Sequence, residues 1–387
     1  MRKINKPLFI GLAFLLSYAF CSAQKFSFYK YNVENGLPQS TVFDIFQDHN
    51  GYLWLGTDGG GVTQYNGHFF KTYNKKDGLA GNVVRKVVED KNNTLWLATN
   101  NGLYYFENDK FKELKLLNEK VSIYVMSLKA HKNKLYVGTT EQGFFEVDLD
   151  SKKPKQYSPQ NSNLSNKFIL DFLVDEDENV WITTVNGGIN CLKPNKEISS
   201  YNDGLLSDVA CVSLFNLGNN NILCGTRFSG FFVFNTKDID KKDFLQNPPF
   251  YLSGNSIWSA NMYQNQLYIA SQENGVFLLD KKTFEPLVHF NKENGLPSNQ
   301  IYKVYPDNQD NLWLATSGSG LVKFAGFSFL SFDKSQIITS SGISCITKIS
   351  DNKYWAGSSD GVFELTSKGG YSFENSKIQR HCHFVHL

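Results

Sequence analysis

Residues 42–67, VFDIFQDHNGYLWLGTDGGGVTQYNG, contain a pattern that the chain repeats along most of its length. An alternating apolar segment leads into a polar turn, a second segment holds Leu53-Trp54-Leu55, and a glycine-rich turn precedes a third segment. Because side chains alternate along a strand, each segment is predicted to be a β-strand. Asn66-Gly67 after the third segment is a typical hairpin turn into a fourth strand.

Seven further segments align with this stretch on its Trp-x-Gly-Thr corner. The residues at the tryptophan position recur every 40 to 45 residues, at Trp54, Trp96, Tyr136, Trp181, Cys224, Tyr268, Trp313 and Trp355. A repeat of this length with several short strands is typical of a propeller blade. The predicted fold class is therefore all-β, a β-propeller of four-stranded blades. The tryptophans, six in the chain, are interpreted as residues of the blade cores.

The residues before the first repeat indicate how the ring closes. FSFYKYN at 26–32 resembles segments that follow the third strand elsewhere, such as HFFKTYN at 68–74, and NGLPQ at 35–39 echoes DGLAGN at 77–82. The segment 26–32 is expected to complete the last blade, because an open ring would leave strand edges unpaired. Seven blades over residues 24–326 are favoured, and eight blades are the alternative.

Both ends of the chain lie outside this ring. Residues 327–370 carry the eighth repeat, interpreted as the start of a second propeller or as an eighth blade, and residues 371–387 are predicted to be an irregular tail. At the amino terminus, basic residues precede an apolar run of about 13 residues, too short for the roughly 20 that span a bilayer. Small residues before Gln24 complete a signal peptide over 1–23, with a lipoprotein at Cys21 as the rival.

Charge and cysteine content exclude several classes of protein. Removal of the first 23 residues takes the formal charge from +2 to −1, and no basic stripe typical of nucleic-acid binding remains. The remaining cysteines are odd in number and lack CxxC spacing, so they predict neither a disulfide framework nor a zinc site. Cys211 and Cys224 lie on adjacent strands of one repeat, so they are either two buried thiols or a bridge.

The repeat body I–x–D–x–x–G–x–LW–L–G–T–x–x–G–G–V, with its NGLP and DGLA linkers, resembles the two-component regulator propeller repeat over residues 26–367. The resemblance implies the periplasmic sensor half of a Bacteroidetes-type hybrid histidine kinase, in which many members sense oligosaccharides. Full members of that family also carry a membrane helix and a kinase. This sequence shows neither after its signal, so it is interpreted as a truncated receptor or a stand-alone periplasmic module, and no kinase activity is carried over.

Catalytic chemistry is not predicted. The histidines fall in turns or outer strands, the terminal His381, His383 and His386 with Cys382 are interpreted as a frayed tail, and no pair of carboxylates is recognised across the channel. No cofactor or metal is expected.

Ligand binding is the favoured interpretation, on the face where the second-to-third-strand loops meet the loops that lead into each inner strand. Amide and carboxylate side chains beside aromatic rings suit sugar hydroxyls, although turns also favour such residues for backbone reasons. Arginine forks suit carboxylates or sulfates, so the ligand is hypothesised to be an acidic or sulfated sugar held partly by Arg85 and Arg227. The candidate residues are Arg85, Arg227, Asp58, Asn100, Glu141, Asn186, Glu273 and Trp258.

The predicted function is thus a ligand-binding sensor propeller in the periplasm, with an extracellular location as the alternative. A carbohydrate-type ligand is expected, together with a periplasmic protein partner or a second copy of the chain, and no nucleic acid. Two rival functions stay open. One is a scaffold whose loop face docks another protein, and the other is a propeller lyase or glycosidase.

Overall fold

A computed structural model describes residues 25–118, 121–202, 206, 209–239, 241, 244–245, 248–327, 330–331, 343–350, 353–358, 361–368 and 372–378. The chain divides into two compact units, and the larger one runs over Phe28–Lys292 and Leu296–Phe324. The expected signal peptide and the terminal histidines lie outside the described residues. None of the helices in the described part of the chain has the length and apolar character needed to cross a bilayer.

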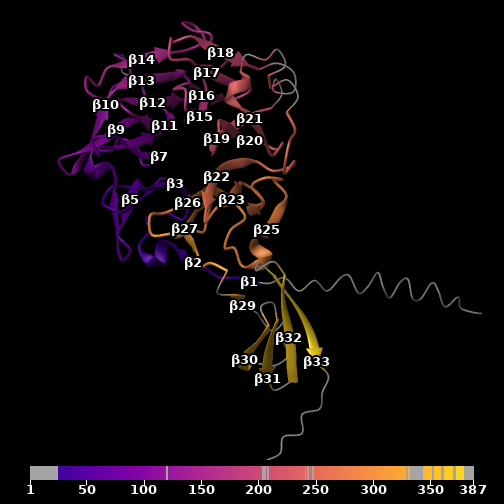
Figure 1. Cartoon of the computed structure of the whole chain (residues 1–387). Coiled ribbons are helices and arrows are strands. Elements are labelled where there is room, and N and C mark those ends of the chain that lie inside the picture. Colours follow the sequence, from indigo (N-terminus) through magenta and orange to yellow (C-terminus); the bar gives the residue numbers. More distant parts are fainter. Residues whose placement is uncertain are drawn as a thin grey trace, which may run out of the picture. The chain divides into compact units, whose positions relative to one another are not determined.

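The larger unit is a β-propeller of seven antiparallel blades (Figure 1). Inner strands β3, β7, β11, β15, β19, β22 and β26 each contact the next around the ring, and β26 contacts β3. These inner strands span Val42–Gln47, Val84–Glu89, Val125–His131, Ile169–Val174, Cys211–Gly218, Ile257–Tyr263 and Ile301–Pro306. The second strands, β4, β8, β12, β16, β20, β23 and β27, span Leu53–Thr57, Leu95–Thr99, Lys134–Thr139, Val180–Thr184, Asn221–Thr226, Gln266–Ser271 and Leu312–Thr316.

The outer half of each blade completes the sheet. The third strands, β5, β9, β13, β17, β21, β24 and β28, span Val62–Tyr65, Gly102–Glu107, Phe144–Asp148, Ile189–Leu192, Phe231–Asn235, Gly275–Leu279 and Leu321–Phe324. The outer strands, β6, β10, β14, β18 and β25, span Phe70–Tyr73, Lys110–Leu114, Pro154–Tyr157, Ile198–Tyr201 and Pro286–Phe290. Short 3-10 turns cover Val33–Asn35, Lys75–Asp77, Thr236–Asp238 and Lys292–Asn294.

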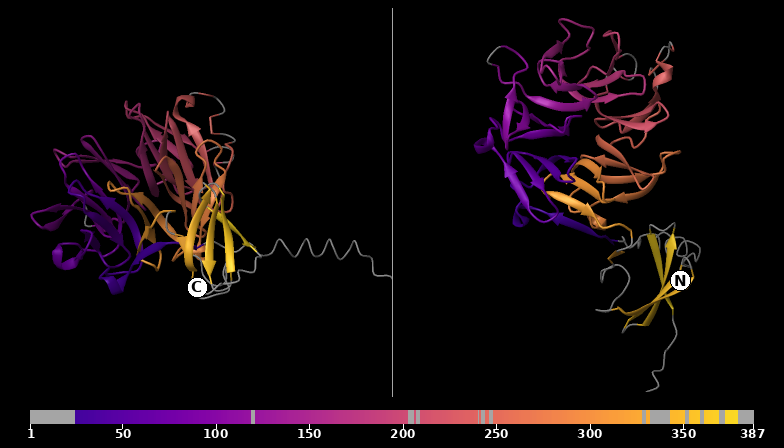
Figure 2. Two further views of the ribbon diagram at one scale, coloured as in Figure 1. Left: turned by 60° about the horizontal axis from the view of Figure 1, so that its bottom comes forward. Right: turned by 60° about the vertical axis from the view of Figure 1, so that its left-hand side comes forward.

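An amino-terminal strand closes the ring, as the sequence predicts. β2 (Phe28–Tyr31) pairs with β28 and is the outer strand of the seventh blade. Figure 2 shows the indigo first blade beside the orange seventh blade. The ring therefore has seven blades, and the alternative of an eight-bladed ring is wrong.

The fifth blade differs from the other six because its described part has three strands. An isolated bridge between Phe231 and Tyr251 stands where an outer strand would pair. Pro248 and Pro249 precede that bridge, and proline cannot donate a ladder hydrogen bond. The composition of this segment accounts for the missing strand.

A buried aspartate fixes the tryptophan in four blades. The Trp54 indole donates to Asp48 at 2.8 Å, and Asp48 also accepts the backbone N–H groups of Asn50 and Tyr52 in its turn. The same bond recurs at 2.7 to 2.8 Å, and its pairs are Trp96 with Asp90, Trp181 with Asp175, and Trp313 with Asp307. All four tryptophans are at most 4% exposed, so these members of the set are core residues as predicted.

The loops between second and third strands hold neighbouring blades together. The Gly61 N–H donates to the Asn82 carbonyl in the loop leading into the next blade, at 2.7 Å. Equivalent bonds recur around the ring, from Gly102 to Ile123, Gly143 to Lys167, Gly230 to Asn255, Gly275 to Asn299 and Gly320 to Ser40. These loops therefore share one end of the propeller, called the loop face below, and the first-to-second-strand turns form the opposite turn face.

The smaller unit contains the eighth repeat. β30 (Ile343–Ser350), β31 (Lys353–Ser358), β32 (Gly361–Lys368) and β33 (Ser372–Ile378) form one antiparallel sheet. Strand β33 lies where the sequence predicts an irregular tail, because its residues pair in register with β32. The same unit contains a two-stranded pairing of β1 (Lys25–Phe26) with β29 (Leu330–Ser331). Trp355 is 42% exposed in this unit, unlike the motif tryptophans of the ring.

Candidate functional site

The central channel is lined by two consecutive residues from six of the inner strands, and by the second residue of β11, whose third residue Ser127 is buried instead. In all seven inner strands the pairing register with the second strand shifts between the first and third residues, for example between Val42 and Asp44. A β-bulge of this kind adds one residue to the strand and re-aims its side chains. The second residues of all seven strands line one cavity, and third residues line that cavity or the larger one beside it.

The second residues form a ring at the loop-face end of the channel, named here the mouth ring. Its members surround a cavity of about 40 Å³. Aromatic and aliphatic side chains predominate, and one member is charged. The mouth ring consists of Phe43, Arg85, Met126, Leu170, Val212, Trp258 and Tyr302.

Arg85 is the charged member of the mouth ring and keeps its hydrogen-bonding capacity. Its guanidinium carbon lies 3.9 Å from the centroid of the Phe43 ring. It makes no hydrogen bond or ion pair with any residue that the structure describes. A half-buried guanidinium stacked on an aromatic ring is held in one plane, and its donors stay available to an acceptor.

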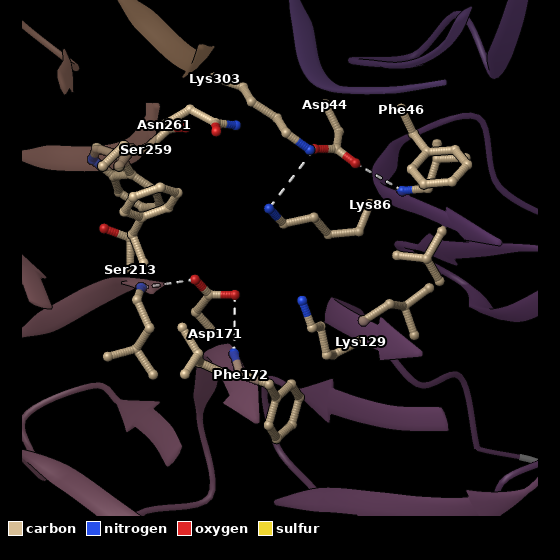
Figure 3. Close-up of a pocket in the computed structure, with 18 of the residues that line it drawn as sticks. Asp44, Phe46, Lys86, Lys129, Asp171, Phe172, Ser213, Ser259, Asn261 and Lys303 are labelled. Carbon is tan, nitrogen blue, oxygen red and sulfur yellow. Dashed lines mark hydrogen bonds and ion pairs between the residues drawn. The ribbon is translucent and has the colours of Figure 1, made fainter. Parts of the chain in front are cut away.

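A wider cavity of about 450 Å³, named here the chamber, follows the mouth ring along the channel. Its lining runs from the third to the sixth residue of several inner strands, so the chamber lies toward the turn face. Charged side chains at the third position are Asp44, Lys86, Asp171 and Lys303, and Lys129 joins them from the fifth position of β11 (Figure 3).

Both chamber aspartates are held by hydrogen bonds that join adjacent blades. Asp44 accepts the Val87 N–H at 2.9 Å and the Lys303 ammonium at 2.5 Å. Asp171 accepts the Leu214 N–H and the Phe172 N–H, both at 2.9 Å. Burial lowers the pKa of Lys303 from its ordinary value, while Asp44 opposes that shift. The carboxylates thus act first as links between inner strands.

Two of the eight residues proposed from the sequence line the mouth, and two more lie on second-to-third-strand loops and contact a residue just before an inner strand. Arg85 and Trp258 belong to the mouth ring. Asp58 forms an isolated bridge with Val83, just before β7. Glu273 accepts the Ser256 N–H at 3.1 Å, just before β22. Trp258 is therefore a channel residue, and its interpretation as a blade-core tryptophan is wrong.

The other four lie on second-to-third-strand loops outside the described cavities. Glu141 pairs with Lys167 at 2.5 Å, and Asn186 has a left-handed backbone with φ of 52°. The Asn100 N–H donates to the Val83 carbonyl, and its buried Oδ1 has no partner in the described structure. Arg227 is exposed and lies 5.3 Å from the ring of Phe228. No contact links Arg227 to Arg85 within the described residues, so their joint hold on one ligand stays a prediction.

The sequence interpretation missed the chamber residues. It expected no pair of carboxylates in the channel, whereas Asp44 and Asp171 both line the chamber. A prediction based on strict alternation places neighbouring side chains on opposite faces of a strand. The bulge instead brings the second and third residues to the same channel, so such a prediction misses them. One signal was present in the aligned repeats: the third residue of every inner strand is polar, at Asp44, Lys86, Ser127, Asp171, Ser213, Ser259 and Lys303.

The described histidines lie outside the channel lining. The described histidines His49, His68, His131 and His289 do not line the mouth or the chamber. Within the described ranges, no group of three or more histidine, cysteine, aspartate or glutamate residues could hold a metal ion.

The family profile of the two component regulator propeller matches residues 36–59, 78–101 and 295–318. Each match runs from a leading loop through an inner strand to the loop after the second strand. Three repeats of this chain are therefore similar to the two component regulator propeller repeat. A search of curated proteins gives no match to this chain.

Solved structures share the propeller fold of this chain. The extracellular domain of the hybrid two component system BT3049 from B. thetaiotaomicron is 23% identical with a TM-score of 0.73, over 92% of this chain and 49% of that one. The corresponding domain of BT4673 from the same organism is 19% identical with a TM-score of 0.63, over 92% and 47%. The chain thus spans about half the length of these domains.

An enzyme shares the architecture as well. A streptogramin B lyase is 11% identical with a TM-score of 0.61, over 77% of this chain and 97% of that one. At this identity the likeness concerns the fold alone.

Proposed function

We propose that this protein is a ligand-binding sensor propeller of a two-component signal transduction system, exported to the periplasm. The regulator propeller repeat supports the sensor role. The extracellular domains that share its fold belong to proteins described as hybrid two component systems. The proposal concerns ligand recognition, and catalysis is not part of it.

The single observation that carries the proposal is Arg85 in the mouth ring. Its guanidinium has no anionic partner among the described residues, and it is held over the aromatic ring of Phe43. Desolvating a cation without a partner costs free energy, so such an arrangement favours a ligand that supplies the anion. Trp258 and Tyr302 in the same ring offer apolar faces for a sugar ring to stack on.

The ligand class that fits this mouth is an acidic or sulfated oligosaccharide. A carboxylate or sulfate would accept hydrogen bonds from the Arg85 fork, and the sugar ring would stack on the aromatic side chains. The Asp58 and Glu273 carboxylates at the rim of the loop face accept hydrogen bonds from sugar hydroxyls. Arg227, with the exposed Phe228 ring beside it, would extend the contact surface on the same face.

The test is titration of the purified protein with matched neutral, uronic-acid-containing and sulfated oligosaccharides by isothermal titration calorimetry. We expect binding of at least one anionic saccharide and a loss of at least tenfold in affinity in Arg85→Ala. The lysine variant Arg85→Lys should lose part of that affinity, because it keeps the charge without the fork. Lys110→Ala removes an exposed charge from outer strand β10 and should bind normally.

Two other results would change the proposed binding residues or the proposed function. Unchanged binding in both Arg85→Ala and Arg227→Ala would exclude these two residues from the site. No binding of any saccharide, together with specific binding of a periplasmic protein or of a second copy of the chain, would favour the scaffold instead.

A further inference from the structure

The chamber presents two lysine amines without a fixed hydrogen-bond acceptor. The Lys86 ammonium lies 3.8 Å from Asp44, beyond hydrogen-bonding distance, and that Asp44 oxygen already accepts from Lys303. Lys129 makes no hydrogen bond or ion pair with the described residues. Figure 3 shows both amines pointing into the open space between the inner strands.

The acidic groups of the chamber are already satisfied. Each oxygen of Asp44 and Asp171 accepts a hydrogen bond, from a backbone N–H or from Lys303. Glu89 at the turn-face side bonds to the His49 ring at 2.6 Å and to the His49 N–H at 2.9 Å. A cation entering the chamber would therefore compete with existing partners. An anion would meet Lys129, which has no partner among the described residues, and Lys86, whose one ion pair with Asp44 is 3.8 Å long.

Neutral groups around the same space also suit an anion that carries hydroxyls. Ser259 and Asn261 line the chamber across from the lysines, and the Asn261 amide can donate or accept (Figure 3). The Trp258 indole N–H, on the shared wall of mouth and chamber, is buried and lacks an acceptor in the described structure. The donors outnumber the uncommitted acceptors.

We propose that the chamber is a second binding site, for a small anion that bears a carboxylate or phosphate group, held between Lys86 and Lys129. A volume of about 450 Å³ accommodates a molecule of sugar-phosphate or tricarboxylate size. The site lies toward the turn face and does not depend on the proposed sugar site at the loop face. The Lys86 side chain is 31% exposed and Lys129 is exposed, so solvent partly screens the charge of both amines.

The experiment uses inorganic phosphate and citrate as probes, each titrated into the full chain at constant ionic strength and followed by calorimetry and thermal unfolding. We expect one or both probes to bind and to raise the unfolding temperature, because a ligand that binds the folded state stabilises it. Which probe binds distinguishes a phosphate from a carboxylate ligand. Lys129→Gln should lower the association constant at least tenfold, and added sodium chloride should weaken binding.

A matched control and a second lysine variant allow the binding measurements to decide for or against the chamber site. Lys153→Gln removes an exposed lysine charge outside the channel and should bind the probes as the parent does. Lys86→Gln should weaken binding as well, and if it fails to fold, Lys129→Gln alone decides, because Lys129 has no partner to lose. The proposal is overturned if neither probe binds, if Lys129→Gln binds as tightly as the parent, or if calcium chloride stabilises the protein where the anions do not.

Discussion

At the scale of single residues, the aspartate of each inner-strand turn explains why the repeat keeps an aspartate six positions before its tryptophan. Asp175 is 7% exposed and accepts from the Trp181 indole, the Asn179 amide and two backbone N–H groups. A buried carboxylate that accepts this many hydrogen bonds stabilises the turn and also anchors the second strand to it. The motif is therefore a hydrogen-bonded unit that joins two elements.

The first prediction concerns Asp175→Asn. The amide presents an NH2 group to donors that need an acceptor, so the free energy of unfolding should fall by about 3 kcal/mol. Asp177→Asn is the control, because Asp177 in the same turn has a half-exposed side chain paired only with Lys237. Urea unfolding measures both variants, and equal losses in the two would contradict the assigned role.

A second residue-scale prediction concerns pH. Burial raises the pKa of Tyr136 from 10.0 to about 12. Because this pKa is raised in the folded state, the contribution of Tyr136 to the free energy of unfolding is complete below pH 10 and is lost as the pH rises toward 12. Tyr136→Phe should remove about 2 kcal/mol of this alkaline loss of stability. Unfolding free energies between pH 8 and 12 test it, and Tyr29→Phe, at a side chain 58% exposed, should keep the parent profile.

At the scale of elements, closure by β2 decides whether seven sheets make a ring. Tyr31 at the end of β2 packs on Tyr65 at 5.6 Å, on Phe70 at 6.3 Å and on Trp313 at 5.7 Å between ring centroids. Tyr65 and Phe70 belong to the first blade and Trp313 to the seventh. One side chain thus joins the first and last blades, in addition to the backbone pairing with β28.

The third prediction follows from that position. Tyr31→Ala should lower the free energy of unfolding by about 2–3 kcal/mol, because it removes aromatic contacts across the ring closure. Tyr29→Ala changes an exposed tyrosine of the same strand and should cost less than about 1 kcal/mol. If the two substitutions have the same effect, Tyr31 does not join the blades energetically.

The turn glycines give the loop face its fixed geometry. Gly143 has φ of 73°, and a Cβ placed on it would lie 2.1 Å from the Tyr157 carbonyl oxygen of the outer strand. Its N–H donates to Lys167 of the next blade, and its carbonyl accepts from Thr139 at 2.7 Å. The Gly-Thr corner seen in the sequence is therefore a joint between strand, loop and neighbouring blade.

At the scale of the whole molecule, the ring is complete without the eighth repeat. The propeller unit ends at Phe324, and its last blade is closed by β2 rather than by any strand after residue 325. The fourth prediction is that a chain ending at Ala325 keeps the thermal unfolding transition of the propeller within about 2 °C. A chain ending at Tyr305 removes β27 and β28, and should lose that cooperative transition because β2 then has no partner.

Much of the fold follows from the sequence because the same strand pattern recurs seven times within the ring. Each copy gives the strand pattern, the turn glycines and the tryptophan position, and the segment 26–32 identifies itself as the closing strand by its likeness to the outer strands of other repeats. The fifth blade is the exception, because an isolated bridge takes the place of its outer strand just after two prolines. The predicted tail carries no repeat signal, and β33 forms there through register with β32.

The loop face was predictable for the same reason, while the content of the channel was not. Arg85 and Trp258 were proposed from the sequence and both line the mouth. Asp44, Lys86, Lys129, Asp171 and Lys303 were passed over because alternation along a strand places neighbouring residues on opposite faces. The β-bulge in each inner strand interrupts this alternation of side chains at one position.

The sequence by itself determined the propeller fold, the strand order within the blades and the strand that closes the ring, because these depend on local patterns repeated along the chain. It left seven and eight blades as alternatives, and the pairing of β2 with β28 in the tertiary structure decided for seven. Only the tertiary structure decided which side chains share the channel. That depends on seven bulges in register around one axis, and on which charged groups find partners across blade boundaries. Asp44 and Asp171 have such partners, whereas Arg85 and Lys129 make no hydrogen bond with the described residues.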